Sequence, residues 1–259
     1  MNPCLTLTHN NLELTKRCVE SIRQQDIQTS IHIIDNGSTD GTLLWLTNQP
    51  DIRFLHNDTN EGVSAGWNEG LRVLFEHYEA EHVLVCGNDT WLPASFYGTL
   101  LSLKLPFVTG IAVDNMEQAE EAALIMPLEP RPDFSAYCIS RECWKRVGPF
   151  DERMKHYCSD QDYHLRAHRK GITLLKASVP YYHERSSTLR LASPEERHEI
   201  ESQANKDRAT LKDKWGVSAG GKDYEALFSP ENFGVNSKQD FHESRLCVVV
   251  AKSDNRESV

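Results

Sequence analysis

The chain has 259 residues, of which 39% are hydrophobic and 25% are charged, so its composition is that of an ordinary globular protein. Its formal charge of −10 argues against a broad contact with a nucleic-acid backbone. No apolar run approaches the ~18 residues that a membrane-spanning helix needs. Residues 1–11 also lack the basic and apolar segments of a signal peptide.

The cysteines give a first indication of compartment. There are seven, an odd number, scattered along the chain with no C-x-x-C pair. This pattern does not favour a disulfide framework or a zinc ribbon. Reduced thiols are typical of cytosolic proteins, so we expect a cytoplasmic location.

Apolar runs and helical spacings alternate through the first 111 residues. Short strands are expected at 4–8, 31–34, 52–55, 83–86 and 107–111. Between them, apolar residues recur at helical spacing in 14–22, 42–46 and 71–78. Strand–helix alternation with short turns predicts an α/β fold, with a doubly wound, mostly parallel sheet flanked by helices.

The pattern changes after residue 112. Residues 113–133 are acidic and contain prolines, so we expect a surface excursion there. Regular structure is expected again at 134–139 and 142–147, in a helix from residue 159 that ends at Lys170-Gly171, and in a strand at 172–177. A long charged helix is expected at 194–215. The predicted organisation is an α/β domain at 1–190, a helical C-terminal extension at 191–237 and a flexible tail at 238–259.

Three turns rich in Asp, Asn, Ser and Gly follow predicted strands, at 35–41, 60–70 and 87–90. In a parallel sheet they fall at one edge, where open α/β sheets bind ligands. Small residues let the backbone approach a ligand, and Asp or Asn can hydrogen-bond a base or a ribose. The chain contains neither G-x-G-x-x-G nor G-x-x-x-x-G-K-[ST], so a dinucleotide or P-loop site is not supported.

Six short segments carry the strongest signal: TLTHN at 6–10, IDNGSTDGT at 34–42, NEG at 60–62, GWN at 66–68, GND at 87–89 and SDQD at 159–162. In this order, over about residues 4–190, they resemble family-2 glycosyltransferases of GT-A fold. The later DKWG at 213–216 is similar to a segment that follows the catalytic domain in many bacterial members. The resemblance implies metal-dependent, inverting transfer of a sugar from a nucleotide-diphosphate donor to an acceptor hydroxyl, with Mn²⁺ or Mg²⁺ as cofactor.

The resemblance also implies roles for single residues. Thr8 and Asp35 would flank the nucleobase, with Asp35 accepting from a ring N–H, as suits a UDP or dTDP donor. Asp89 and His183 would bind the metal, and Asp160 would be the general base. The other donor-binding positions are Asn10, Asn36, Asn60, Gly62, Gly66, Asn68 and Asn88.

Two positions depart from the family pattern. Gly87 replaces the first Asp of a D-x-D motif, and Ser159 replaces the Glu of an E-D pair. These departures leave open a non-catalytic nucleotide-sugar-binding protein of the same fold. A sugar nucleotidyltransferase is another alternative, although such enzymes usually begin with a glycine-rich phosphate loop and residues 4–16 contain no glycine.

Some candidates also have an ordinary structural interpretation. His183 is one of eleven histidines, most of which must be surface or core residues, and Asp160 could cap the helix that follows it. Asp162 is the next candidate for the base, but two residues along a helix it points to a different face. The sugar and the acceptor stay open: a saccharide, a lipid-linked saccharide, a protein hydroxyl and a modified nucleobase all fit.

Overall fold

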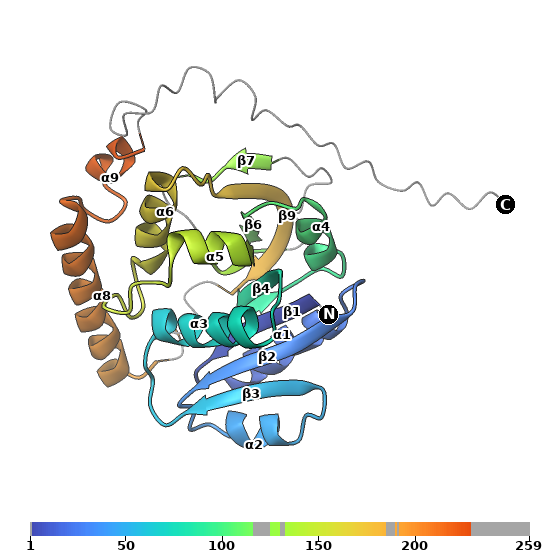
Figure 1. Ribbon diagram of the computed structural model, residues 1–259. Helices are drawn as coiled ribbons and strands as arrows, with labels where there is room; N and C mark the ends of the chain where they lie inside the picture. Colours follow the sequence, from blue (N-terminus) through green and yellow to red (C-terminus); the bar gives the residue numbers. More distant parts are fainter. Residues whose placement is uncertain (1, 116–124, 130–132, 185–189, 191, 229–259) are drawn as a thin grey trace.

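The structure, a computed structural model, describes residues 2–115, 125–129, 133–184, 190 and 192–228 (Figure 1). Its strands are β1 (Asn2–Thr8), β2 (Thr29–Asn36), β3 (Ile52–Asn57), β4 (His82–Gly87), β5 (Thr90–Trp91), β6 (Phe107–Val113), β7 (Ile125–Pro127), β8 (Ala136–Ser140) and β9 (Leu175–His183). They form one sheet in the order β3-β2-β1-β4-β8-β6-β9-β5, and β7 pairs with β9.

The sheet is mostly parallel, which confirms the predicted fold class. Strands β1 to β4 are parallel to one another, and β6 is parallel to β9. The exception in the centre is β8, which is antiparallel to both β4 and β6. The chain just before β8 is held to the end of β4, because the Gly87 N–H donates to the Ser135 carbonyl at 2.9 Å. Residues 133–135 therefore lie beside the Gly87–Asp89 turn.

Helices cover both faces of the sheet (Figure 1). Side chains alternate along β4, so that Val83 and Val85 pack under α3, α5 and α6, while Leu84 and Cys86 pack under α1 and α4. Strands buried on both faces read as continuous apolar runs, as residues 83–86 do. The helices are α1 (Leu12–Arg23), α2 (Thr42–Thr47), α3 (Val63–Arg72) with a π-helical continuation η1 (Val73–His77), α4 (Phe96–Ser102), α5 (Arg141–Val147), α6 (Ser159–Arg169), α8 (Pro194–Trp215) and α9 (Lys222–Ala226).

Strand β9 differs from the expectation of a strand at 172–177, because it begins at Leu175 and continues to His183. The sequence does not suggest a strand that continues past Pro180, because proline lacks the N–H that a central strand needs. In the structure Pro180 pairs with Ile111 just after a shift in the β6–β9 register, where an irregular ladder tolerates a residue without an N–H. The longer strand makes His183 a strand residue.

The long helix α8 has the predicted bounds and clear end signals. Ser193 and Glu196 form a capping box with Pro194 at the first turn, and Gly216 ends the helix at φ 74°. Helix α8 buries Ala204, Asp207 and Leu211, and its C-terminal end meets α6 where Trp215 donates to Asp162 (Figure 1). None of the described helices is long and apolar enough to cross a membrane.

Three predictions lie wholly or partly outside the described residues. The tail predicted at 238–259 lies wholly outside them, as do residues 116–124 and 130–132 of the expected excursion and residues 191 and 229–237 of the predicted C-terminal extension. The described part of that excursion includes β7, which pairs antiparallel with β9. The excursion is thus partly built into the sheet.

Candidate active site

A cavity of about 320 Å³ lies between the start of α3, the chain before β8 and the segment that leads into α6. Three of its residues precede β8, and five come from the approach to α6 and its first turn. The lining residues are Val63, Trp67, Asp133, Phe134, Ser135, His156, Tyr157, Cys158, Ser159 and Asp160.

Asp160 lines this cavity from the first turn of α6. Burial raises the pKa of its carboxyl to about 6, and the negative charge of Asp133 adds to the shift. The residue before the helix is Cys158, at φ 65° and without a side-chain cap, so the interpretation of Asp160 as a helix cap is wrong. A carboxyl with a pKa near 6 is mostly ionised at neutral pH, and it is a stronger base than an ordinary Asp.

Asp162 has a different environment, although it is only two residues away. Its carboxylate is fully buried and accepts from Arg166 Nε at 2.8 Å and from Trp215 Nε1 at 2.8 Å. Lys214 Nζ also lies 2.7 Å from it. Asp162 therefore fastens α6 to the end of α8, which explains the Lys-Trp pair of the DKWG segment and leaves Asp162 unsuited to act as a base.

Asp89 and His183 are brought together by the pairing of β5 with β9, which places Thr90 opposite His183. Asp89 Oδ2 lies 3.4 Å from His183 Nε2. The other ring nitrogen of His183, Nδ1, lies 3.2 Å from Ser135 Oγ, and that hydroxyl is in turn hydrogen-bonded to Asp133. The ring of His183 is thus held on one side and directed at Asp89 on the other.

The Asp89–His183 pair suits a divalent cation that takes its remaining ligands from a phosphate and water. Within the described residues no set of three His, Cys, Asp or Glu side chains is placed to hold a metal ion by itself. Gly87, at the first position of the D-x-D motif, leaves room for this arrangement. A Cβ at residue 87 would stand 2.8 Å from Asp89 Oδ1, so a side chain there would have to displace the Asp89 carboxylate.

Three of the predicted donor-binding residues join the ends of β1, β2 and β4. Asn88 Nδ2 donates to Thr8 Oγ1 at 3.1 Å. Asn10 accepts from the Thr39 N–H at 2.8 Å through its side chain, and its own N–H donates to Ser38 Oγ at 2.8 Å. Residues 8–10 at the end of β1 therefore contact both the 35–41 turn and the 87–90 turn, two of the three turns predicted to share one edge of the sheet.

Asp35 is also at this edge, but its carboxylate is fully buried. Asp35 Oδ2 lies 2.9 Å from His56 Nδ1, and Oδ1 accepts from the Ser38 N–H at 3.1 Å. His56 covers Asp35 because the two residues are opposite each other in the parallel β2–β3 register. The Asp35 carboxylate is thus already bonded to His56, whose side chain is 29% exposed, and its contact with a base N–H stays a prediction.

Asn36, Asn60 and Gly62 shape the turn after β3 by bonding to one another. Asn60 Oδ1 accepts from Asn36 Nδ2 at 2.9 Å and from the Gly62 N–H at 3.0 Å. Gly62 has φ 95°, and a Cβ there would stand 2.8 Å from Lys155, so the position requires glycine.

Gly66 and Asn68 do not line an open surface, which corrects the expectation for these two residues. Helix α3 begins at Val63, so both residues lie inside the helix rather than in the turn. A Cβ on Gly66 would overlap the Leu7 side chain, so this glycine lets α3 pack on β1. Asn68 is 1% exposed and bonds the backbone of Phe150 in both directions, at 2.9 and 2.8 Å.

Comparison with known protein families gives one match, which covers about two fifths of the chain. Residues 4–105 match the family model described as glycosyl transferase family 2. This match, together with the shared fold described next, supports a glycosyltransferase enzyme. No curated protein sequence matches the chain.

Solved structures of glycosyltransferases share the fold of this one at low sequence identity. A mannosyltransferase from Pyrobaculum calidifontis in complex with GDP-Man and Mn²⁺ matches with TM-score 0.60 and 16% identity, over 89% of this chain and 68% of its own. TarS 1–349 of S. aureus in complex with UDP matches with TM-score 0.54 and 16% identity, over 95% of this chain and 76% of its own. GalNAc-T7 with UDP, GalNAc and Mn²⁺ matches with TM-score 0.61 and 12% identity, over 88% of this chain and 50% of its own. The glycosyltransferase therefore has the GT-A fold.

Three residues that position the site of this glycosyltransferase were not singled out in the sequence. His56 could have been found from the sequence, since it follows a predicted strand parallel to the one that ends at Asp35. Ser135 has none, because only the antiparallel insertion of β8 brings it to His183. Asp207, fully buried in α8, accepts from the N–H groups of residues 155–157 at 3.1, 2.9 and 2.9 Å and so fixes one wall of the cavity.

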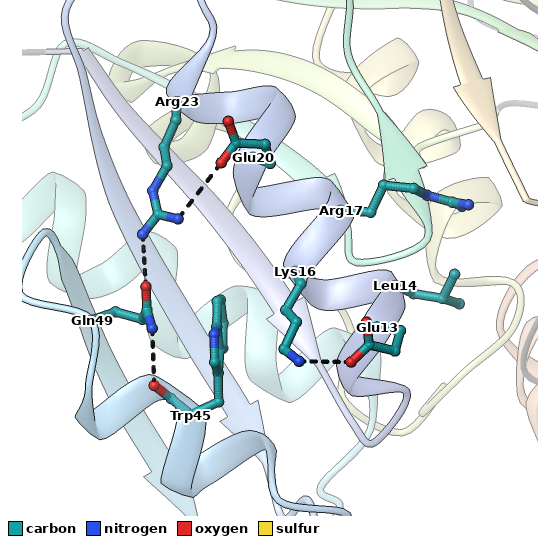
Figure 2. A pocket seen from close by; sticks show the side chains of 8 residues that line it. All are labelled: Glu13, Leu14, Lys16, Arg17, Glu20, Arg23, Trp45 and Gln49. Carbon is teal, nitrogen blue, oxygen red and sulfur yellow. Dashed lines mark hydrogen bonds and ion pairs between the residues drawn. The ribbon is translucent and has the colours of Figure 1, made fainter.

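A larger cavity of the glycosyltransferase, about 560 Å³, lies between α1 and α2 (Figure 2). Its polar groups bond mainly to one another. Lys16 Nζ lies 2.6 Å from Glu13, Arg23 donates to Gln49 at 2.9 Å, and Gln49 donates to the Trp45 carbonyl at 3.4 Å. This cavity contains none of the predicted site residues, so we place the candidate active site at the smaller cavity beside Asp160.

Proposed function

We propose that this glycosyltransferase moves a sugar from a UDP- or dTDP-sugar to an acceptor hydroxyl, with inversion and with a divalent metal, Mn²⁺ or Mg²⁺. One observation carries the proposal. The Asp160 carboxyl, with its pKa raised to about 6, lines a cavity whose other wall contains Asp133 and Ser135, and these two residues contact His183. Residues 133–135 therefore line the cavity of the proposed base and also contact the proposed cation-binding pair through His183.

Asp160 would act as the general base. An acceptor hydroxyl bound in the cavity would give its proton to the Asp160 carboxylate while its oxygen forms the new bond to the anomeric carbon. The bond between that carbon and the diphosphate oxygen breaks in the same step, and its electron pair leaves with the nucleoside diphosphate. Attack opposite the leaving group inverts the anomeric centre.

Asp89 and His183 would hold the metal, and Ser135 would keep the His183 ring in place. When bound, the metal would neutralise the charge that develops on the leaving diphosphate. Two residues suffice for this role because Mg²⁺ and similar cations commonly take one or two protein ligands together with substrate phosphates.

The donor nucleotide would lie along the edge formed by Thr8, Asn10, Asn88 and the Asp35–His56 pair. This edge would be supported by the neighbouring residues Asn36, Asn60, Gly62, Gly66 and Asn68. Similar structures hold GDP-Man, UDP and UDP-GlcNAc, which supports a nucleotide-sugar donor. The acceptor class and the cytoplasmic location stay predictions. We also propose that α8 acts together with the predicted 1–190 domain.

Thermal stabilisation by nucleotides tests this proposal, because a ligand that binds the native state raises the unfolding temperature. We expect UDP to stabilise the protein more than ADP, and Mn²⁺ to increase the effect of UDP. Asp89→Ala should remove the increase that Mn²⁺ gives. The matched control is Asp58→Ala, which alters an exposed carboxylate outside the site and should keep the increase. An equal effect of Mn²⁺ in Asp89→Ala would remove Asp89 from the metal site, and equal effects of UDP and ADP would refute the donor assignment.

A further inference from the structure

A second cavity, of about 260 Å³, lies at the opposite end of α6 from Asp160. Arg169 follows Asp160 by nine positions, which is about 14 Å along a helix. The lining side chains are mostly cationic, and none is acidic: Val147, Arg166, Arg169, Lys170, Lys214 and Trp215. In a chain with a formal charge of −10, such a concentration of positive charge needs an explanation.

Two of these cations are partly neutralised by buried or half-buried acids. Lys214 Nζ lies 2.7 Å from both Asp151 and Asp162, and Arg166 donates to Asp162 at 2.8 Å. Arg153 Nη2 also donates to Asp151 Oδ2, at 2.7 Å. Two carboxylates therefore serve three cations, so these five side chains together carry a net positive charge, although Arg153 itself does not line the cavity.

The remaining two cations, Arg169 and Lys170, form no ion pair with any acid in the described residues, and both are exposed. The guanidinium carbon of Arg169 lies 4.3 Å from the ring centroid of Trp215. Such stacking holds a planar guanidinium in one orientation while its N–H groups keep their capacity to donate.

The usual preference for cations at helix C-termini does not by itself explain the positions of the Arg169 and Lys170 side chains. Cations in the last turn of a helix are favoured because they bind its free carbonyls and oppose its dipole. Arg166 and Arg146 do this here, donating to the carbonyls of Val147 and Lys170 at 3.0 and 3.1 Å. The side chains of Arg169 and Lys170 make no such bond in the described part of the chain, and they remain available at the mouth of the cavity.

We propose that this cavity binds a phosphate group, presented as a phosphate monoester or diester. A phosphate carries several acceptor oxygens at one centre, so it can bridge a guanidinium fork and neighbouring ammonium groups at once. A cavity of about 260 Å³ has ample room for it, since one water takes only ~30 Å³. The site is separate from the Asp89–His183 pair and goes beyond the proposed transfer reaction.

Calorimetric titration of the full chain with inorganic phosphate, at constant ionic strength and without divalent metal, tests this proposal. We expect the double variant Arg169→Gln/Lys170→Gln to bind phosphate at least ~10-fold more weakly, since it loses two charge-assisted contacts. The matched control is Arg72→Gln/Lys104→Gln, which removes the same charge from two exposed positions outside every cavity described above. This control should bind phosphate as the wild type does. Circular dichroism of both variants checks that the fold is kept.

Methyl phosphate and dimethyl phosphate then distinguish the two forms of ligand. Binding of methyl phosphate alone assigns the cavity to a terminal phosphate, and binding of both assigns it to a phosphate within a chain; either result supports the proposal. Equal phosphate affinity in the wild type and the Arg169→Gln/Lys170→Gln variant would overturn it. An equal loss of affinity in the matched control would also overturn it, because the effect would then reflect net charge alone.

Discussion

The strand-end turns within residues 8–89 and the region of residues 133–215 build the candidate site in different ways. In the first region, most of the predicted site residues bond one another, as Asn36 does with Asn60 and Asn88 with Thr8. In the second region, Asp160 lines a cavity. The turn motifs therefore specify the shape of the sheet edge, while the proposed reactive group comes from residues 133–215, where the sequence patterns are weaker.

The second region also depends on contacts between distant segments. Asp207 in α8 holds the backbone of residues 155–157, and Lys214 and Trp215 hold Asp162. The carbonyl of Lys155 accepts from the N–H of Val63, at 2.6 Å, so the same segment reaches the start of α3. Helix α8 thus supports the cavity on which the proposed chemistry depends.

The largest expected effect separates the two neighbouring carboxylates of α6. Asp160→Asn keeps the shape of the side chain and removes the base, so sugar transfer should fall by about 10²–10⁴-fold while UDP-sugar binding is kept. Asp162→Asn should instead lower the unfolding temperature, since it disturbs a buried carboxylate with three donors. Initial rates and thermal unfolding of both variants measure this. Transfer by Asp160→Asn within a few-fold of the wild type would refute the base assignment.

A smaller effect is expected from the outer partner of His183. Ser135→Ala removes the hydroxyl bonded to His183 Nδ1, so the affinity for Mn²⁺ in the presence of UDP should fall by about 10–100-fold. Titration of UDP stabilisation with Mn²⁺ measures the change. Ser102→Ala is the matched control, because the Ser102 hydroxyl bonds only a carbonyl of its own helix and should leave the affinity unchanged. An unchanged affinity in Ser135→Ala would remove Ser135 from the proposed site.

Asp207→Asn tests whether α8 supports the cavity. An amide NH₂ cannot accept, so at least one N–H of residues 155–157 loses its partner, and the free energy of unfolding should fall by about 1–3 kcal/mol. Chemical denaturation measures the change, and KM for the acceptor should rise because His156 and Tyr157 line the cavity. Asp213→Asn alters an exposed carboxylate of the same helix and should change neither quantity. Equal stability of the two variants would show that α8 is dispensable for this wall.

The smallest effect concerns pH. Burial raises the pKa of Asp160 from 3.8 to about 6, so the carboxyl becomes protonated and inactive as the pH falls through 6. With saturating donor and Mn²⁺, transfer should be half-maximal near pH 6 and fall about tenfold for each further unit. Because the folded-state pKa is above the unfolded one, the free energy of unfolding should also decrease as the pH rises from 3.8 to about 6, a decrease that Asp160→Asn removes. A rate independent of pH down to 4.5 would contradict the assignment.

Much of the fold is predictable from the sequence, because local patterns report local structure. The apolar runs of β1 to β4, the helical spacing of α1 and the capping residues of α8 each depend on a few neighbouring residues. The turn motifs also predict that the turns at 35–41, 60–70 and 87–90 share one edge, since the carboxyl ends of parallel strands coincide. The bonds from Asn10 to Ser38 and from Asn88 to Thr8 bear this out for the turns at 35–41 and 87–90.

By itself, then, the sequence determined the α/β class, the strand-end turns and the candidate residues Asp89, Asp160 and His183. Only the tertiary structure decided that His56 covers Asp35, that Gly66 and Asn68 pack inside, and that Asp160 rather than Asp162 faces the cavity. These outcomes depend on strand register, on the antiparallel insertion of β8 and on the docking of α8. The physical reason is that they arise from contacts between segments far apart in the chain, whereas a sequence pattern reports only what a residue and its near neighbours prefer.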